Sequence, residues 1–161
     1  MARRILKILH LLGAIGLTGA LASYMILLAT APDDSMADYA IVRSNIEAIS
    51  GWLLVPSLAI ALMSGLLAMA VYSPFQNAGW VWAKAVLGLP MFEGTLVTID
   101  STAQHAAALS AQAAAGDVDP ALLSEMLARE WRTLWFIMAL SIAQTVLGVW
   151  RPRRRRRRTP M

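Results

Sequence analysis

The amino-acid sequence predicts an all-α integral membrane protein, a four-helix bundle with up-down-up-down topology and both termini in the cytoplasm. Three observations predict this class: the composition, the spacing of the charged residues and the position of the basic ones. Of the 161 residues, 58% are hydrophobic and 15% are charged, whereas a water-soluble domain carries about 25% charged residues. The composition therefore excludes a soluble enzyme, a disordered tail and a coiled coil. The chain has no cysteine, which excludes disulfides, thiolate metal sites and cysteine catalysis.

Four segments with few or no charges are long enough to cross a membrane. The expected spans are about 5–30, 48–72, 80–100 and 131–150. A helix needs about 20 residues to cross about 30 Å of hydrocarbon, and it satisfies its own backbone hydrogen bonds there. We therefore expect one membrane domain over residues 1–150, followed by an arginine-rich cytoplasmic tail at 151–161.

The basic residues set the expected orientation. Ten of the 14 basic residues lie at the two ends of the chain. The segments 31–47 and 100–130 are acidic instead, and each contains a single arginine. The positive-inside rule places basic ends in the cytoplasm, so both termini are expected there.

Local signals predict where two of the helices begin. Ser44 and Glu47 have the spacing of a capping box and predict a helix start just before the second span. The helical pattern continues without a break from Pro120 to Trp150, so the fourth helix is expected to begin outside the bilayer.

Small residues at four-residue spacing predict close helix packing, because they let two backbones approach each other. In the first span they are Gly16 and Ala20, and in the second they are Ser57, Ala61 and Gly65.

Glu93 is the most informative polar residue. It lies 13 residues after Trp80, which is about 20 Å along a helix. An acid at such depth costs at least about 2.5 kcal/mol. We therefore expect Glu93 to face the interior of the bundle, with a partner or a bound proton.

Asp100 and Gln104 share the helical face of Glu93, and Arg132 is expected level with Asp100. These positions predict an Asp100–Arg132 ion pair with Glu93 one or two turns deeper. Two interpretations fit the four residues: a relay or polar ligand pocket, or a hydrogen-bond network that sets the helix register.

The two histidines are possible ligands. His10 lies inside the cytoplasmic face at the depth of Gln144, which predicts a hydrogen bond between the two side chains. His105 lies near the outer surface, so a single haem b bound by both histidines does not fit. Haem held by one histidine and one methionine does fit.

Copper(I) is the other cofactor that the sequence allows. The soft ligands expected near the outer surface are Met25, Met36, His105 and Met126. Nine methionines in an apolar chain also fit simple core filling, and the metal-free interpretation is the one we adopt.

The tail is expected to bind lipid. Its seven arginines are Arg151, Arg153, Arg154, Arg155, Arg156, Arg157 and Arg158. Next to a membrane span, such a run anchors the topology and attracts anionic phospholipids. This position favours lipid over nucleic acid.

Two short stretches carry a family resemblance. Residues 5–14, ILKILHLLGA, resemble the first helix of small bacterial integral membrane proteins of unknown function, which are similar to the copper-resistance CopD family. Residues 79–85, GWVWAKA, and 92–96, FEGTL, resemble the third helix of the same group. The resemblance implies a four-helix inner-membrane protein with a metal or haem connection, in which His10 would be the ligand.

No catalytic motif occurs in the sequence. The favoured function is therefore a non-catalytic accessory or interaction subunit that assembles with other membrane subunits or with itself. The alternatives are a copper- or haem-handling protein and a proton-coupled transport element that uses Glu93 and Asp100.

Overall fold

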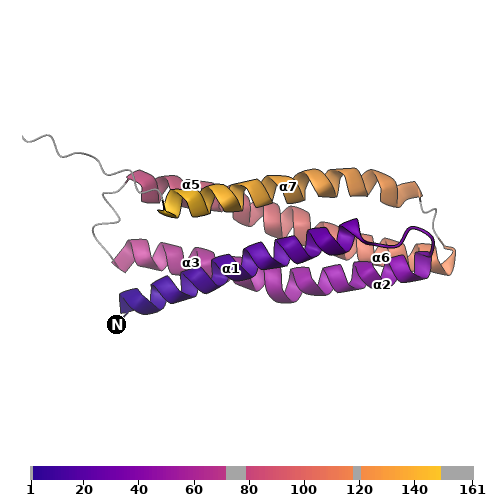
Figure 1. Ribbon diagram of the computed structural model, residues 1–161, viewed down its shortest axis with the longest axis horizontal. Coiled ribbons are helices and arrows are strands. Elements are labelled where there is room, and N and C mark those ends of the chain that lie inside the picture. Colours follow the sequence, from indigo (N-terminus) through magenta and orange to yellow (C-terminus); the bar gives the residue numbers. More distant parts are fainter. Residues whose placement is uncertain (1, 72–78, 118–120, 150–161) are drawn as a thin grey trace, which may run out of the picture.

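The computed structural model describes residues 2–71, 79–117 and 121–149, and it arranges them as four long helical rods (Figure 1). The elements are α1 (Ala2–Ala29), α2 (Met36–Ile49), η1 (Ser50–Leu54), α3 (Val55–Val71), α5 (Gly79–Glu93), η2 (Gly94–Asp100), α6 (Ser101–Ala115) and α7 (Ala121–Val149). The second rod joins α2, η1 and α3, and the third joins α5, η2 and α6. All regular structure in these described ranges is helical, so the all-α class is confirmed.

Two of the rods are long and apolar enough to cross a membrane, Arg3–Ala29 and Met36–Val71. The second of these has 36 residues, or about 54 Å at 1.5 Å per residue, well beyond about 30 Å of hydrocarbon. Much of the segment 31–47, expected as a loop, is therefore helix α2. The third rod likewise continues past 100 to Ala115. The helices thus extend beyond an apolar zone at the end opposite the N-terminus.

Of the two helix starts expected from the sequence, one is wrong and the other is confirmed. The expected start at Ser44 and Glu47 is wrong, because both residues lie inside α2. The N-cap is Ser35, whose Oγ accepts a hydrogen bond from the Asp38 amide at 3.3 Å. A capping motif can also occur within a helix when tertiary packing extends the helix toward its N-terminus. The early start of the fourth helix is confirmed, since α7 begins at Ala121.

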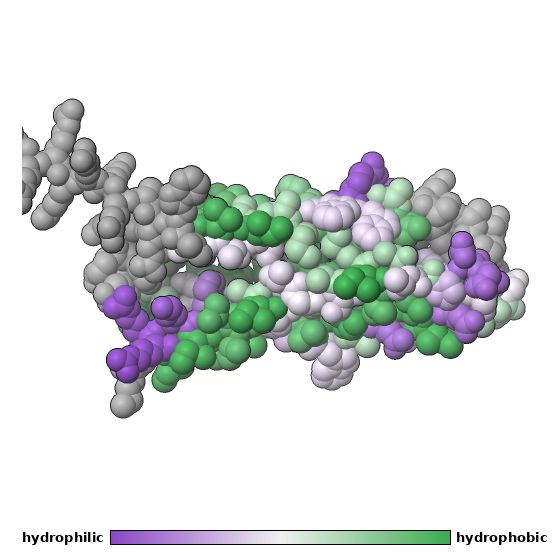
Figure 2. Space-filling view, in the orientation of Figure 1, coloured by the Kyte–Doolittle hydropathy of each residue, from purple (hydrophilic) through white to green (hydrophobic). Residues whose placement is uncertain are grey.

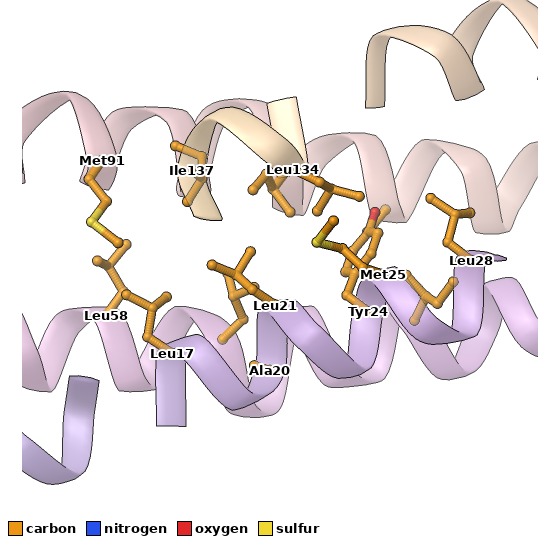
Figure 3. Packing of buried hydrophobic residues seen from close by; sticks show 14 residues of the cluster. Leu17, Ala20, Leu21, Tyr24, Met25, Leu28, Leu58, Met91, Leu134 and Ile137 are labelled. Carbon is orange, nitrogen blue, oxygen red and sulfur yellow. The ribbon is translucent and has the colours of Figure 1, made fainter. Parts of the chain in front are cut away.

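Helix α1 packs along α3, α6 packs along α2, and α5 packs along α7. The third rod therefore crosses the molecule, from α7 at one end to α2 at the other (Figure 1). The core residues of α1 recur every three or four positions and point toward α3 and α7 (Figure 3). They are Leu17, Ala20, Leu21, Tyr24, Met25 and Leu28.

The closest backbone approach joins α1 to α3. A Cβ atom added to Gly13 would lie 2.6 Å from the Ala61 amide nitrogen and 2.7 Å from the Ser57 carbonyl oxygen. Gly16 lies against the Ser57 hydroxyl, and Gly65 lies under the His10 ring. The predicted packing through small residues is therefore confirmed at this interface.

The outer surface is unusually apolar for a folded chain. Figure 2 shows hydrophobic side chains along the length of the rods and hydrophilic ones gathered at the N-terminal end and at the far end. Large exposed apolar side chains include Ile8, Leu12, Ile15, Ile26, Met63, Val86, Leu89, Val97 and Trp135. Such a surface is stable against lipid tails rather than water.

Candidate functional site

Two π-helical segments, η1 and η2, lie in contact where the rods leave the apolar zone. π-Helical turns are rare and occur frequently at functional sites. The ring of Pro56, two residues after η1, crowds the carbonyl of Trp52, and the widened turn relieves this clash. Pro56 is thus a signal in the sequence for the position of η1.

One carboxylate connects the two segments. The buried Ser50 hydroxyl of η1 donates to Oδ1 of Asp100 at the end of η2, at 2.9 Å. The Gln104 amide, one turn further along α6, donates to Oδ2, also at 2.9 Å. Both carboxylate oxygens of Asp100 therefore have a partner.

A pocket of about 270 Å³ opens beside this carboxylate. Its lining comes from α2, η1, η2 and α6: Ser44, Glu47, Ala48, Gly51, Trp52, Asp100 and Gln104. Two carboxylates and an 86% exposed indole favour positive charge and hydrogen-bond donors.

We expect Ser50→Ala to lower the free energy of unfolding by about 1 kcal/mol, because a hydrogen bond to a partly buried carboxylate is lost. Detergent–SDS unfolding monitored by tryptophan fluorescence would measure this change. Ser44→Ala is the matched control: Ser44 is exposed in the same pocket and should change stability by less than about 0.5 kcal/mol. Equal losses in the two variants would contradict a structural role for the Ser50–Asp100 bond.

A second polar cluster lies between α1, α2 and α7, with Tyr24, Arg43 and Glu130 buried. Nη1 of Arg43 lies 2.8 Å from both carboxylate oxygens of Glu130, and the two side chains are 0% and 2% exposed. The Tyr24 hydroxyl also donates to Glu130. Nε of Arg43 donates to the Tyr39 hydroxyl at 2.9 Å, one helical turn earlier. This cluster joins three rods beyond the α1–α3 interface.

The charge pattern of the sequence does not reveal this cluster, because Arg43 and Glu130 fall in the acidic segments expected between the spans. The pattern that identifies Glu130 is its spacing of four and seven residues from the buried Leu134 and Ile137. Arg43 is likewise three residues before the buried Ile46. Extending the helical periodicity outward would have placed both charges on core faces.

The expected Asp100–Arg132 ion pair is wrong. Asp100 accepts from Ser50 and Gln104, whereas Arg132 is exposed on α7. The side chain of a helical residue leans toward the N-terminus of its helix, which directs Arg132 outward along α7 and away from the core. The ion pair that spans α2 and α7 is Arg43–Glu130 instead.

Glu93, expected to face the interior, is exposed at the end of α5. Among the described residues, none forms a hydrogen bond or ion pair with its carboxylate. Val86, Leu89 and Val97, which are 68%, 67% and 65% exposed, lie on the same outer stripe as Glu93. Glu93 is thus a single acid on an apolar outer face.

The π-helical segment η2 explains why Glu93 and Asp100 do not share one inward face. Glu93 and Asp100 are seven residues apart, which returns to the same face of an α-helix. The intervening segment, Gly94–Asp100, is π-helical and has more residues per turn than an α-helix. Asp100 therefore turns toward Ser50 while Glu93 faces outward. A relay that links Glu93 to Asp100 along one face has no support in this geometry.

The expected His10–Gln144 hydrogen bond is also wrong. Nδ1 of His10 lies 2.7 Å from the Ala61 carbonyl oxygen on α3, and the Gln144 amide donates to the Lys84 carbonyl at 3.1 Å. Helix α1 packs on α3, so His10 meets α3 rather than α7. His10 thus joins α1 to α3, and its role as a ligand stays a prediction.

The proposed soft ligands lie in different surroundings. Met25 is buried in the core with Leu28 (Figure 3), whereas His105 is exposed and bonds the Ser101 carbonyl at 2.8 Å. Met126 is half-buried on α7. Within residues 2–71, 79–117 and 121–149, no three His, Cys, Asp or Glu side chains gather as metal ligands do. Arg151 and Arg153 to Arg158 lie outside the described residues.

The family model of a predicted integral membrane protein (DUF2269) matches residues 4–152, nearly the whole chain. The chain belongs to this family. The membership confirms the expected resemblance to uncharacterised integral membrane proteins, while the likeness to CopD stays a prediction. Comparisons with curated proteins and with solved structures returned no match.

Proposed function

We propose that this DUF2269 protein is a four-pass subunit of the bacterial inner membrane, with no catalysis of its own, that assembles with another membrane protein. The observation that carries the proposal is Glu93, an acid without a described partner on the apolar outer face of α5 and η2. We call the stripe formed by Val86, Leu89, Glu93 and Val97 the Glu93 face.

The placement in the membrane follows from surface chemistry. The apolar zone of the rods lies in the hydrocarbon, with the N-terminal end in the cytoplasm and the α2–α6 end outside. The tail, Arg151 to Arg158, then meets the anionic phospholipids of the cytoplasmic leaflet. The pocket beside Asp100 lies at the outer interface.

This placement puts Glu93 inside the hydrocarbon. It lies seven residues before Asp100, or about 10 Å below the outer interface at 1.5 Å per residue. An acid exposed to lipid there costs at least about 2.5 kcal/mol. A protein surface that supplies a hydrogen bond or a charge removes this cost, and the removal stabilises the assembly.

The direction of the side chain strengthens this argument. Side chains on a helix lean toward its N-terminus, and for Glu93 that end of α5 is the cytoplasmic one. The short glutamate side chain therefore leans away from the nearer, outer interface. It cannot relieve its cost by reaching the outer headgroups in the way that a long lysine or arginine does.

Site-specific photo-crosslinking in membranes tests the proposal. A photoreactive residue at Leu89, on the Glu93 face, is expected to yield a discrete adduct with a membrane protein. The same residue at Ile15 is the matched control, because Ile15 is 61% exposed on α1 and Leu89 is 67% exposed. No adduct from Leu89, or the same adduct from both positions, would overturn the proposed subunit role.

A further inference from the structure

We infer that the partner helix carries a basic side chain, lysine or arginine, which pairs with Glu93 inside the membrane. This inference rests on the proposed function and adds the chemistry of the partner. The Glu93 carboxylate is exposed at a depth where the described part of its own chain has no cation.

Contacts between the third rod and α7 show which residue of α7 lies at the depth of Glu93. A Cβ atom added to Gly94 would lie 2.9 Å from Cδ1 of Ile137, and the Gln144 amide bonds the Lys84 carbonyl. Glu93 is therefore level with Met138 on α7. The segment 133–150 contains no charged residue.

The first two spans offer no cation at this depth either, because 8–32 and 48–72 contain no charged residue. The nearest cations along the rods are Lys84 and Arg132. Lys84 lies nine residues from Glu93, and Arg132 lies six residues from Met138. These separations correspond to about 13 Å and about 9 Å of depth, in opposite directions.

A second copy of the chain would not supply a cation at the depth of Glu93. Copies inserted with the same topology present each residue at the same depth in the membrane. A second copy would therefore bring another Glu93, or apolar residues, against the Glu93 face. Two acids at one site repel each other unless they share a proton. Charge complementarity thus favours an unlike helix with a basic residue.

Synthetic transmembrane peptides test the charge preference with the full chain in liposomes. The probe is a leucine–alanine helix with one arginine about 10 Å below the outer interface, and the comparison peptide has leucine there. Energy transfer to a dye on Thr159→Cys, the only cysteine in that variant, reports association. The arginine peptide should associate about tenfold more strongly.

Glu93→Leu should abolish this preference, and Arg132→Leu, which changes an exposed charge on α7, should retain it. Equal association of the two peptides, or a preference that survives Glu93→Leu, would overturn the basic partner. Rapid formation of disulfide dimers by the Val97→Cys variant would also overturn the basic partner, because it would show that a second copy of the chain lies against the Glu93 face. A Leu89 adduct with an unlike membrane protein, found together with any of these results, would retain the proposed function and reject only this inference.

Discussion

Replacing Glu130 with alanine is expected to lower the free energy of unfolding by about 3–5 kcal/mol, because the variant leaves Arg43 buried without a counter-charge. Arg43 is 0% exposed, and its Nη2 already has no partner among the described residues. The substitution also removes the acceptor of the Tyr24 hydroxyl. Detergent–SDS unfolding, monitored through the tryptophan fluorescence of the chain, would measure the loss.

A double replacement separates the cost of an unpaired charge from the contribution of the pair. Arg43→Met combined with Glu130→Leu removes both charges and should recover most of the stability, since apolar residues of similar volume replace buried ion pairs at little cost. Arg132→Ala is the control, because this exposed arginine should contribute less than about 0.5 kcal/mol. A loss below about 1 kcal/mol for Glu130→Ala would show that water or lipid headgroups compensate Arg43.

Replacing Gly13 with leucine is expected to lower the free energy of unfolding by about 1–3 kcal/mol, the range of overpacked cores. The new Cβ would lie 2.6 Å from the Ala61 amide nitrogen. The obstacle is backbone rather than a flexible side chain, so α1 and α3 must separate. Separation would also break the His10–Ala61 hydrogen bond. The same unfolding measurement gives the size of the effect.

Gly19→Leu is the matched control for the Gly13 variant. It makes the same substitution in the same helix, with the same gain in helix propensity, but a Cβ at Gly19 meets nothing within 4 Å. This variant should retain or slightly raise the stability. Equal destabilisation of the two variants would mean that the α1–α3 contact is not the close approach that the structure describes.

The apolar part of the fold could be predicted from the sequence, and its polar contacts could not. Helices and small-residue packing depend on local composition and spacing, as Gly16 and Ser57 illustrate at the α1–α3 interface. Polar partners depend on which rods are neighbours. Depth along the helices predicts Gln144 as the partner of His10, but α1 packs on α3, so the partner is the Ala61 carbonyl.

Hydrophobicity and charge distribution suffice to predict that this chain is helical and belongs in a membrane, because they are additive properties that need no partner. Which polar groups meet depends instead on how the rods pack in three dimensions. The π-helical turns at Ser50–Leu54 and Gly94–Asp100 rotate one half of a rod against the other. That rotation turns Asp100 toward Ser50 and leaves Glu93 on the outer face.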